Sequence, residues 1–556
     1  MFLPFFQNDG TKLTKMLHFG GLDLRHKPSD ASLSQAENMS AEAFPALMPR
    51  KSREMVAKES GITAAIAPEY TGAPITAFTG VKENGFYYQG TRIGTRTLTD
   101  GEKSLVDFNG KICIFPDKLY YDYLPDPDTG EVYQDLKPME KTLSLSNVTF
   151  YSSMDELTES YTAYLQKNGA DFDACFAAGD SIAISGASKK QNNTVFLQSR
   201  KAYAEKDAIV SAVVESCTKD RLNLLLYTKS GSKALFENTT DSSDVTVKRT
   251  IPDMNHVCVH NNRLWGTGTG GEYLYASKLG DCFSFHSFQG MEDDSWYSVI
   301  GTPGEFCGIV SYRSAVVAFK HHCIHHVYGD GPKNYAIPKQ TMGGCIDGRS
   351  IQELGGVLYY LSANGICAYS GGEPYGVSPQ LPAAYRFGVA GTDGRCYYLS
   401  ATCEDGTKDL LVYDPEKNLW QREDDTEFLA FIHFGNRLYG VVENGILAFA
   451  QGNERVSWSF TTAPMTYDSL KHKGVNTLWI LLDKEESAEV SVSISHNQKD
   501  FVPCGILSAG AGLKGYRVPI RFQTCDSFRL RIKGQGKAVI HALEMSVYQG
   551  GKTYDI

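Results

Sequence analysis

The segment Gly355-Gly356-Val357-Leu358-Tyr359-Tyr360-Leu361-Ser362-Ala363-Asn364-Gly365-Ile366 decides the fold class. A Gly-Gly turn leads into an apolar and aromatic run, and an Asn-Gly turn then leads into a second one. Glycine and asparagine supply the positive φ angles that a two-residue hairpin turn demands. The segment therefore predicts consecutive antiparallel strands joined by tight turns.

The same pattern recurs along the chain, with turns near residues 262, 313, 356, 394 and 436. The interval of about 40 to 50 residues is the length of one four-stranded propeller blade. The pattern predicts a β-propeller of six or seven blades. An antiparallel sandwich with regular hairpins is the alternative, because a repeat cannot by itself show radial closure. The copies include Val106–Cys113, Val257–Trp265, Ser311–Phe319, Gly394–Leu399 and Phe434–Tyr439.

Composition agrees with an all-β class. The chain has 556 residues with 31 Tyr, 28 Phe and 53 Gly, a mixture that strands and tight turns favour. A chain of this length is expected to form several cores. We expect an N-terminal arm, a propeller interrupted by a small inserted module, and a C-terminal β-sandwich. The predicted boundaries are 1–55 for the arm, 56–145 and 218–452 for the propeller, 146–217 for the module and 453–556 for the sandwich.

The inserted module is predicted from a break in the repeat. Ser153–Tyr161 has Ser and Glu spaced as in a capping box, which predicts a short helix. Phe176–Gly186 contains a Gly-Asp turn and alternating apolar residues, which predict a strand, and a polar tip follows at Lys189–Asn193. The apolar pattern of the predicted blades appears again at Leu222–Tyr227.

The two ends of the chain have different patterns. Phe19–Arg25 and Pro45–Arg50 interrupt a segment with few periodic apolar positions, which predicts an extended arm laid over another surface. Val490–Ser495 and Phe528–Ile532 alternate strictly, as strands with one buried face do. Arg529 and Arg531 should then lie on one face of the sandwich.

Charge and cysteine usage narrow the function classes. The net charge of -10 opposes nucleic-acid recognition. The apolar Met1–Phe6 segment lacks the basic leader of a signal peptide, and no apolar run reaches the roughly 18 residues of a membrane span. We therefore expect no membrane anchor and synthesis in a cytoplasm. The 13 Cys form no CxxC pair, which argues against a disulfide framework or a structural zinc site.

No sequence motif indicates catalysis or a cofactor. Asp293-Asp294 and Asp424-Asp425 lie in polar stretches where solvation is the ordinary explanation for paired carboxylates. Gly266–Gly271 lacks the Lys-Ser/Thr ending of a phosphate loop. We predict that the protein is not an enzyme, with no catalytic residue and no cofactor.

The histidine-rich string Lys320–His326 invites a metal assignment. On a strand, His321, Cys323 and His325 would share one face, so a complete site would need ligands from a neighbouring strand. We favour a structural or interface role for these side chains, with a titratable contact near pH 6.5 as a second hypothesis. Whether the string binds a metal is left open.

Several of these segments together resemble the β-propeller tail proteins of short-tailed phages, the tail nozzle and packaged-DNA stabilisation proteins. The resemblance spans the chain and involves no catalytic motif. Its segments are the arm from Phe19 to Arg50, Gly179–Gly186, Ala318–Lys320 with His326–Gly329, Gly344-Cys345, Gly365–Gly372, and Trp458–Gly551 ending in Tyr548-Gln549-Gly550-Gly551.

The resemblance implies a virion structural protein, assembled in a bacterial cytoplasm. It would form a homohexameric ring below the portal or adaptor protein, retain packaged DNA until ejection, let passing DNA through without sequence-specific contact, and anchor fibres or spikes. The alternative is a receptor- or glycan-binding protein at the tail tip, because a sandwich after a propeller could present aromatic residues to sugars. Candidate interface residues are Arg25, Arg50, Lys189, Lys190, His321, His325, Arg529 and Arg531.

Overall fold

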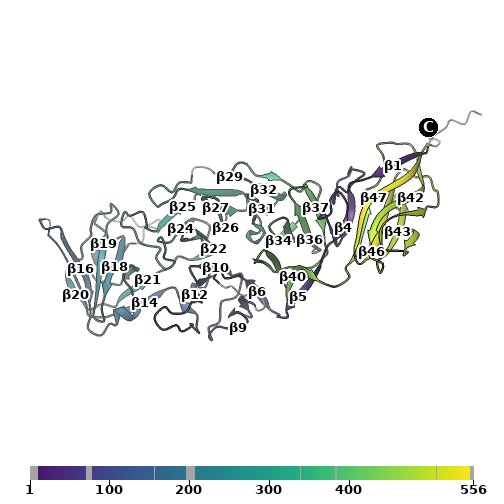
Figure 1. The fold of residues 1–556 in the computed structure, drawn as a ribbon. Helices are drawn as coiled ribbons and strands as arrows, with labels where there is room; N and C mark the ends of the chain where they lie inside the picture. The colour runs from purple at the N-terminus through teal and green to yellow at the C-terminus, as the bar shows by residue number, and fades with distance from the viewer. Residues whose placement is uncertain are drawn as a thin grey trace, which may run out of the picture. The chain divides into compact units, whose positions relative to one another are not determined.

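The computed structural model describes residues 11–70, 78–155, 157–195, 207–337, 340–381, 385–508 and 510–550, and their regular structure is almost entirely β-strand, with 52% strand and 2% helix (Figure 1). The Met1–Phe6 segment and Gly551 lie outside the described residues. Contacts divide the described chain into two units: residues up to 62 and from 349 onward form unit 1, and residues 63–348 form unit 2.

Seven sheets in the described chain have four antiparallel strands each, in the order expected for propeller blades. Four are assigned to unit 2: β6 (Ile62–Ala65), β7 (Gly80–Lys82), β8 (Gly85–Tyr88) and β9 (Thr91–Arg92); β10 (Ser104–Phe108), β11 (Lys111–Phe115), β12 (Leu119–Asp122) and β13 (Lys137–Pro138); β22 (Met254–His260), β23 (Arg263–Gly268), β24 (Tyr273–Ala276) and β25 (Trp296–Val299); β26 (Phe306–Tyr312), β27 (Ala315–Lys320), β28 (Cys323–Tyr328) and β29 (Gln340–Met342).

Three such sheets belong to unit 1. They are β30 (Gln352–Leu354), β31 (Val357–Ser362), β32 (Gly365–Tyr369) and β33 (Tyr375–Gly376); β34 (Tyr385–Thr392), β35 (Tyr397–Cys403), β36 (Lys408–Asp414) and β37 (Leu419–Arg422); β38 (Ala430–Phe434), β39 (Arg437–Val442), β40 (Gly445–Gly452) and β5 (Ser52–Ala57). The short 3-10 turn Gly348–Ser350 lies at the boundary between the units.

The predicted fold class, an all-β propeller with an inserted module and a β-sandwich, is confirmed, and the seven four-stranded sheets match the larger of the two predicted blade numbers. The predicted hairpin turns are confirmed as well. Asn109, Asn261 and Asn436 have φ angles of 50°, 47° and 60°, and each precedes the second strand of its sheet. These are the left-handed conformations that the turn residues were expected to supply.

The last sheet of unit 1 takes its fourth strand from the N-terminal part of the chain. β5 runs antiparallel beside β40, with Met55 opposite Leu447 and Glu54 opposite Ala448 (Figure 1). Gly445 opens β40 at a φ of 154°, and a Cβ atom there would lie 2.2 Å from the carbonyl oxygen of Ala57. A glycine is therefore required where the two strands meet.

The inserted module is an eight-stranded sheet in unit 2, which extends beyond the predicted range of 146–217 in both directions. Leu222–Tyr227, which we compared with the blades, belongs to this sheet. In spatial order its strands are β14 (Lys141–Leu145), β21 (Val245–Arg249), β17 (Ser181–Ser185), β18 (Ser211–Cys217), β19 (Arg221–Tyr227), β16 (Ser160–Gln166), β15 (Val148–Asp155) and β20 (Thr239–Asp241), with α1 (Phe172–Cys175) and the 3-10 turn Lys190–Asn192 between strands.

The helix predicted at Ser153–Tyr161 is wrong, because the segment forms the end of β15, a turn and the start of β16. Phe150 and Ser152 of β15 are buried, whereas Tyr151 alternates outward and stacks on Tyr164 of β16 with ring centroids 5.0 Å apart. This cross-strand pairing is non-local, and it outweighs the local helix-start signal.

The C-terminal sandwich of unit 1 has two antiparallel sheets. One contains β1 (Lys12–Met16), β47 (Ala538–Gln549), β42 (Lys473–Lys484) and β45 (Gly512–Pro519). The other contains β2 (Leu33–Glu37), β41 (Ser457–Thr462), β46 (Phe528–Gln535), β43 (Glu489–His496) and β44 (Val502–Leu507). Trp458, Phe460 and Leu530 are among the residues that fill the core between them.

The N-terminal segment contributes strands to two different structures within unit 1. β1 pairs with β47 and β2 with β41, so Phe19 and Leu33 become part of the sandwich core. A short β-pair, β3 (Met39–Ser40) with β4 (Met48–Pro49), follows, and β5 then joins the propeller sheet. The predicted arm is therefore built into the sheets as strands, and the sandwich is incomplete without it.

Gly21 marks a close approach of this segment to β37. Its φ is 74°, and a Cβ atom there would lie 2.7 Å from the backbone oxygen of Trp420, which accepts a hydrogen bond from the Leu22 N–H at 2.8 Å. A side chain at this position would have to displace backbone, which is costly in a packed structure.

We expect Gly21→Ala to lower the stability of the chain more than Gly406→Ala does. Gly406 also has a left-handed φ, of 86°, but a Cβ atom there meets nothing within 4 Å. The control should lose roughly 1–2 kcal/mol from backbone strain alone, and Gly21→Ala about a further 1–3 kcal/mol from overpacking. Urea denaturation measures both, and equal losses would contradict the close approach.

Candidate functional site

The candidate site is a polar pocket in unit 1, where the segment before β5 passes the sheets that contain β34 and β38. Its volume is about 510 Å³. The N-terminal segment supplies Glu42 and Lys51 to its wall, and the two sheets supply Asp393, Arg395, Arg437 and Phe449.

Two arginines reach the pocket because the hairpin repeat places them there. Arg395 follows Gly394 in the turn between β34 and β35, and Arg437 follows Asn436 and begins β39. Both turns join the first two strands of consecutive four-stranded sheets. Turns at corresponding places in two neighbouring sheets therefore line one pocket.

A buried group of two arginines and two carboxylates holds the N-terminal segment against the propeller at this point. Arg53 lies 2.5 Å from Glu423 and 2.9 Å from Asp424, and Arg50 lies 3.2 Å from Asp424. The Arg53 guanidinium also lies over two aromatic rings, 5.3 Å from the centroid of Phe428 and 5.0 Å from that of Phe449.

The electrostatics of this group follow from burial and pairing. Burial lowers the pKa of Arg53, but Glu423 and Asp424 outweigh it, and the pKa is raised overall. Burial raises the pKa of Asp424, yet Arg53 and Arg50 bring it below its ordinary value. Arg53 and Asp424 therefore remain charged at neutral pH and compensate each other.

The two other carboxylates of the pocket, those of Asp393 and Glu42, already have hydrogen-bond or ion-pair partners within the protein. Asp393 accepts hydrogen bonds from the backbone N–H groups of Arg395 and Cys396, at 2.9 and 2.7 Å, and from the Tyr398 hydroxyl at 3.1 Å. Burial raises the pKa of Tyr398 well above its ordinary value, so its hydroxyl keeps the proton that it donates. Glu42 pairs with Lys51 at 2.8 Å.

A small recess of about 20 Å³ adjoins the pocket and has room for one water-sized polar group. Gln421 lines it, with only 3% of its surface exposed, and neither atom of its side-chain amide has a hydrogen-bond partner among the described residues. The Gln421 amide thus offers donors on its nitrogen and an acceptor on its oxygen at the inner wall of the site.

A second pocket, of about 550 Å³, lies in the sandwich. Val502, Pro503, Pro519, Arg521 and Phe522 are among its lining residues. The end strands β44 and β45 also carry exposed apolar side chains outside this pocket: Ile506 is 68% and Leu513 is 58% exposed. This end of the sandwich offers apolar contact surface.

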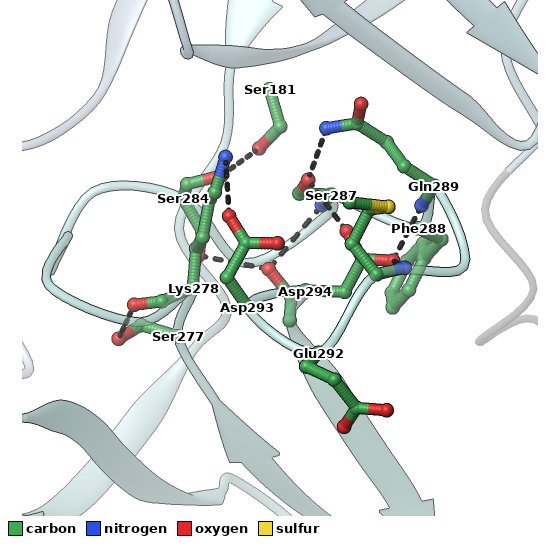
Figure 2. Close-up of polar contacts among 12 residues, drawn as sticks. Ser181, Ser277, Lys278, Ser284, Ser287, Phe288, Gln289, Glu292, Asp293 and Asp294 are labelled. Atoms are coloured by element: carbon green, nitrogen blue, oxygen red, sulfur yellow. Dashed lines mark hydrogen bonds and ion pairs between the residues drawn. The ribbon is translucent and has the colours of Figure 1, made fainter. Parts of the chain in front are cut away.

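In unit 2 the structure places Asp293 and Asp294 in the loop between β24 and β25, and their environments differ (Figure 2). Asp294 is buried and accepts hydrogen bonds from the backbone N–H groups of Gln289, Gly290 and Met291 at 2.6, 2.6 and 2.9 Å. Burial raises its pKa, although these N–H groups oppose the shift. The expectation of a solvated turn is therefore wrong for Asp294.

The same loop fastens the inserted module to its blade. Ser284 donates a hydrogen bond to Ser181 of β17 at 2.8 Å (Figure 2), and the Phe288 N–H donates to Ser211 of β18 at 3.1 Å. Asp293 is half-exposed and pairs with Lys278 at 3.3 Å. The Asp294 carboxylate thus holds the loop in shape, and the loop holds the module.

The histidine-rich string does not lie on one strand face. His321 and His322 form the exposed turn between β27 and β28, whereas His325 is buried on β28. His325 contacts the Thr302 hydroxyl at 2.8 Å, and burial lowers its pKa to about 4, which opposes a titration of this side chain near pH 6.5. In the described part of the chain, no group of three or more His, Cys, Asp or Glu side chains is placed to hold a metal ion.

The other predicted interface residues are spread over the chain, and only Arg50 contributes to the pocket. In unit 1, Arg25 pairs with Asp23 at 2.6 Å, and Arg529 and Arg531 both lie over the Phe501 ring. In unit 2, Lys189 pairs with Glu237 at 2.5 Å, and Lys190 lies in the 3-10 turn after it.

Sequence analysis missed Arg395, Arg437, Asp393 and Tyr398. The available signal was an arginine at a repeat turn: Arg395 lies within one turn, and Arg437 directly follows the other. No helix in the described chain has the length and apolar character that crossing a membrane requires.

No family model and no curated protein matches the sequence. Solved structures match weakly. An exo-β-1,3-galactanase from Phanerochaete chrysosporium is 10% identical over 52% of this chain and 95% of that chain, with a TM-score of 0.21. The SapL1 lectin in complex with alpha methyl fucoside is 13% identical over 44% and 92%, with a TM-score of 0.22. The N-terminal domain of Nup159 is 9% identical over 49% and 96%, with a TM-score of 0.21. At these values the matches carry no argument about function.

Replacement of Asp294 by alanine should destabilise unit 2, because it leaves three loop N–H groups without their acceptor. An unsatisfied buried donor costs about 1–3 kcal/mol. The matched control, Asp293→Ala, removes only a half-exposed ion pair and should cost about 1 kcal/mol or less. Thermal unfolding of both variants compares the two losses. A loss for Asp294→Ala no larger than that for Asp293→Ala would mean that this carboxylate does not shape the loop.

Proposed function

We propose that the protein binds glycans without catalysis, through the pocket between the N-terminal segment and the sheets that contain β34 and β38. The observation that supports this most directly is the pocket itself. Its volume is about 510 Å³, and its wall combines the guanidinium groups of Arg395 and Arg437 with the aromatic ring of Phe449. Ligand sites commonly combine a concave surface of this size with a few placed polar groups.

Rigid elements hold the pocket side chains. Arg395, Arg437 and Phe449 lie on or directly beside antiparallel strands, and the Arg53 group fixes the opposite wall. A preorganised wall lowers the entropy cost of binding a flexible saccharide. Sugar hydroxyls are donors and acceptors, so they match the amide, guanidinium and carboxylate groups present.

The test uses the full chain, because the sandwich includes β1 and β2 and would be incomplete if expressed from residue 453 onward. We expect an array of bacterial surface glycans to yield at least one ligand with a Kd of roughly 10⁻³ to 10⁻⁵ M. Arg437→Ala should weaken binding about tenfold, through loss of charge-assisted hydrogen bonds. Arg313→Ala, a control at the corresponding turn of a unit 2 sheet, should not weaken it.

Two results would contradict this proposal. One is the absence of saccharide binding at millimolar concentration. The other is binding that survives Arg437→Ala but is lost in Phe522→Ala, which would move the site to the sandwich pocket.

We also propose a second function, that of a ring component in a phage tail, supported by the apolar end of the sandwich. Exposed apolar surface of this kind is typical of contacts between subunits, and Ile506 and Leu513 lie on the end strands β44 and β45. The proposed assembly is a ring of six copies that contacts a portal or adaptor protein, fibres or spikes, and passing DNA.

The ring proposal predicts six-fold particles in negative-stain images of the chain with portal–adaptor complexes. Ile506→Lys should abolish the rings by placing a charge in the contact. Monomers in images of the chain alone and of the chain mixed with portal–adaptor complexes would contradict the ring and leave glycan binding as the remaining proposal.

A further inference from the structure

We propose that the pocket selects saccharides that carry a carboxylate, such as uronic or sialic acids, through the paired guanidinium groups of Arg395 and Arg437. This inference rests on the proposed glycan-binding function and specifies its ligand. It follows from which charged side chains of the pocket already have partners within the protein.

Most charges of the pocket are compensated within the protein. Lys51 pairs with Glu42, and Arg50 pairs with Asp424 and lies 3.5 Å from Glu423. The Asp393 carboxylate is occupied by two backbone N–H groups and the Tyr398 hydroxyl. None of these carboxylates forms an ion pair with Arg395 or Arg437 among the described residues.

The two remaining cations form no ion pair in the described part of the chain. Burial lowers the pKa of Arg395, but the charges of Cys396, Asp393, Asp414 and Glu42 outweigh it and raise the pKa overall. Arg437 finds only a neutral acceptor: in the amide orientation that satisfies both groups, the Gln451 oxygen accepts from its Nε and Nη1 atoms at 3.2 and 3.1 Å. For Arg395, the described residues include no hydrogen-bond acceptor or ion pair for the guanidinium. Both side chains are exposed, so an incoming anion can reach them.

An arginine at the first position of the second strand of a sheet can have hydrogen-bond partners within the protein. Arg263 begins β23 as Arg437 begins β39, yet it is buried and donates to the carbonyl oxygens of Ser277 and Glu292 at 2.8 and 2.7 Å. That arginine closes a loop within its own sheet. Among the described residues, Arg395 has no such acceptor and Arg437 donates only to the Gln451 amide oxygen, which leaves their remaining donors for a ligand.

The chemistry of the guanidinium favours a carboxylate among the groups that saccharides carry. Its planar fork matches the two oxygens of a carboxylate and forms parallel, charge-assisted hydrogen bonds. A neutral hydroxyl accepts one weaker bond and leaves the positive charge uncompensated. Two such forks on one wall should therefore discriminate an acidic sugar from its neutral counterpart.

The experiment compares a uronic-acid oligosaccharide with the same oligosaccharide after reduction of its carboxylates to primary alcohols. Isothermal titration of the full chain should give at least tenfold tighter binding of the acid form. The preference should shrink as salt rises from about 50 to 300 mM, because exposed charges are screened. Sulfated and phosphorylated oligosaccharides of the same length form two further arms.

Variants assign the preference to the two arginines. Arg395→Gln and Arg437→Gln should each weaken binding of the acid form at least tenfold and binding of the reduced form by a clearly smaller factor, because a neutral hydroxyl loses only a weaker hydrogen bond. Retained binding of the reduced form shows that a variant is folded. Arg313→Gln, which removes the same charge at a repeat turn in unit 2, should change neither affinity.

Equal affinity for the acid and reduced forms would overturn the inference while the proposed glycan-binding function stands. Tighter binding of the sulfated or phosphorylated form than of the carboxylated one would also overturn it, by assigning the arginines to a different anion. Binding of no saccharide at all would overturn both proposals. An unchanged preference for the acid form in both glutamine variants would show that these two arginines do not select the carboxylate.

Discussion

The pairing of β5 with β40 is the constraint on which unit 1 depends. Before this strand, the chain has already contributed β1 and β2 to the two sheets of the sandwich. After β2 it must reach the open side of β40, and the Arg50, Arg53, Glu423 and Asp424 group fixes its path. Removing one partner of such a buried group typically costs about 3–5 kcal/mol, because it strands an uncompensated charge. The group therefore specifies position as well as adding attraction.

The candidate pocket is a consequence of this path. Its one wall is the N-terminal segment, and its other wall is formed by hairpin turns of two propeller sheets. The side chains that hold the segment, Arg50 and Arg53, use the carboxylates of Glu423 and Asp424. As a result, the arginines at the repeat turns are left with their positive charge toward solvent. The ion pairs on one side of the pocket thus leave guanidinium groups on the other side that form no ion pair within the described chain.

Local chemistry predicted much of the fold. Asn-Gly, Asn-Asn and Gly-Asn pairs adopt the turn conformations that their φ preferences require, and the sheets begin and end around them. The helix expected at Ser153–Tyr161 failed because a short capping signal competes with a stacked Tyr151–Tyr164 pair from another strand. A short stretch of sequence does not reveal which residues of another strand will lie beside it.

The site was harder to predict than the fold for the same reason. Arg395 and Arg437 are separated in sequence, and only the stacking of consecutive sheets gives them one pocket. The strand character of Ser52–Ala57 has no local signature, because its partner β40 lies near the other end of the propeller segment. Burial of His325 likewise depends on Thr302, which lies outside its own sheet strand.

Hydrogen–deuterium exchange on the full chain tests the central claim most directly, through the backbone amides of Ser52–Ala57. If β5 completes the sheet of β38–β40, a peptide covering these residues should exchange more slowly than an unfolded chain, because the amides that face β40 are hydrogen-bonded, and Arg53→Ala should accelerate its exchange selectively. Exchange as fast as in an unfolded chain would show that β5 does not occupy this place, and the pocket built against it would lose its wall.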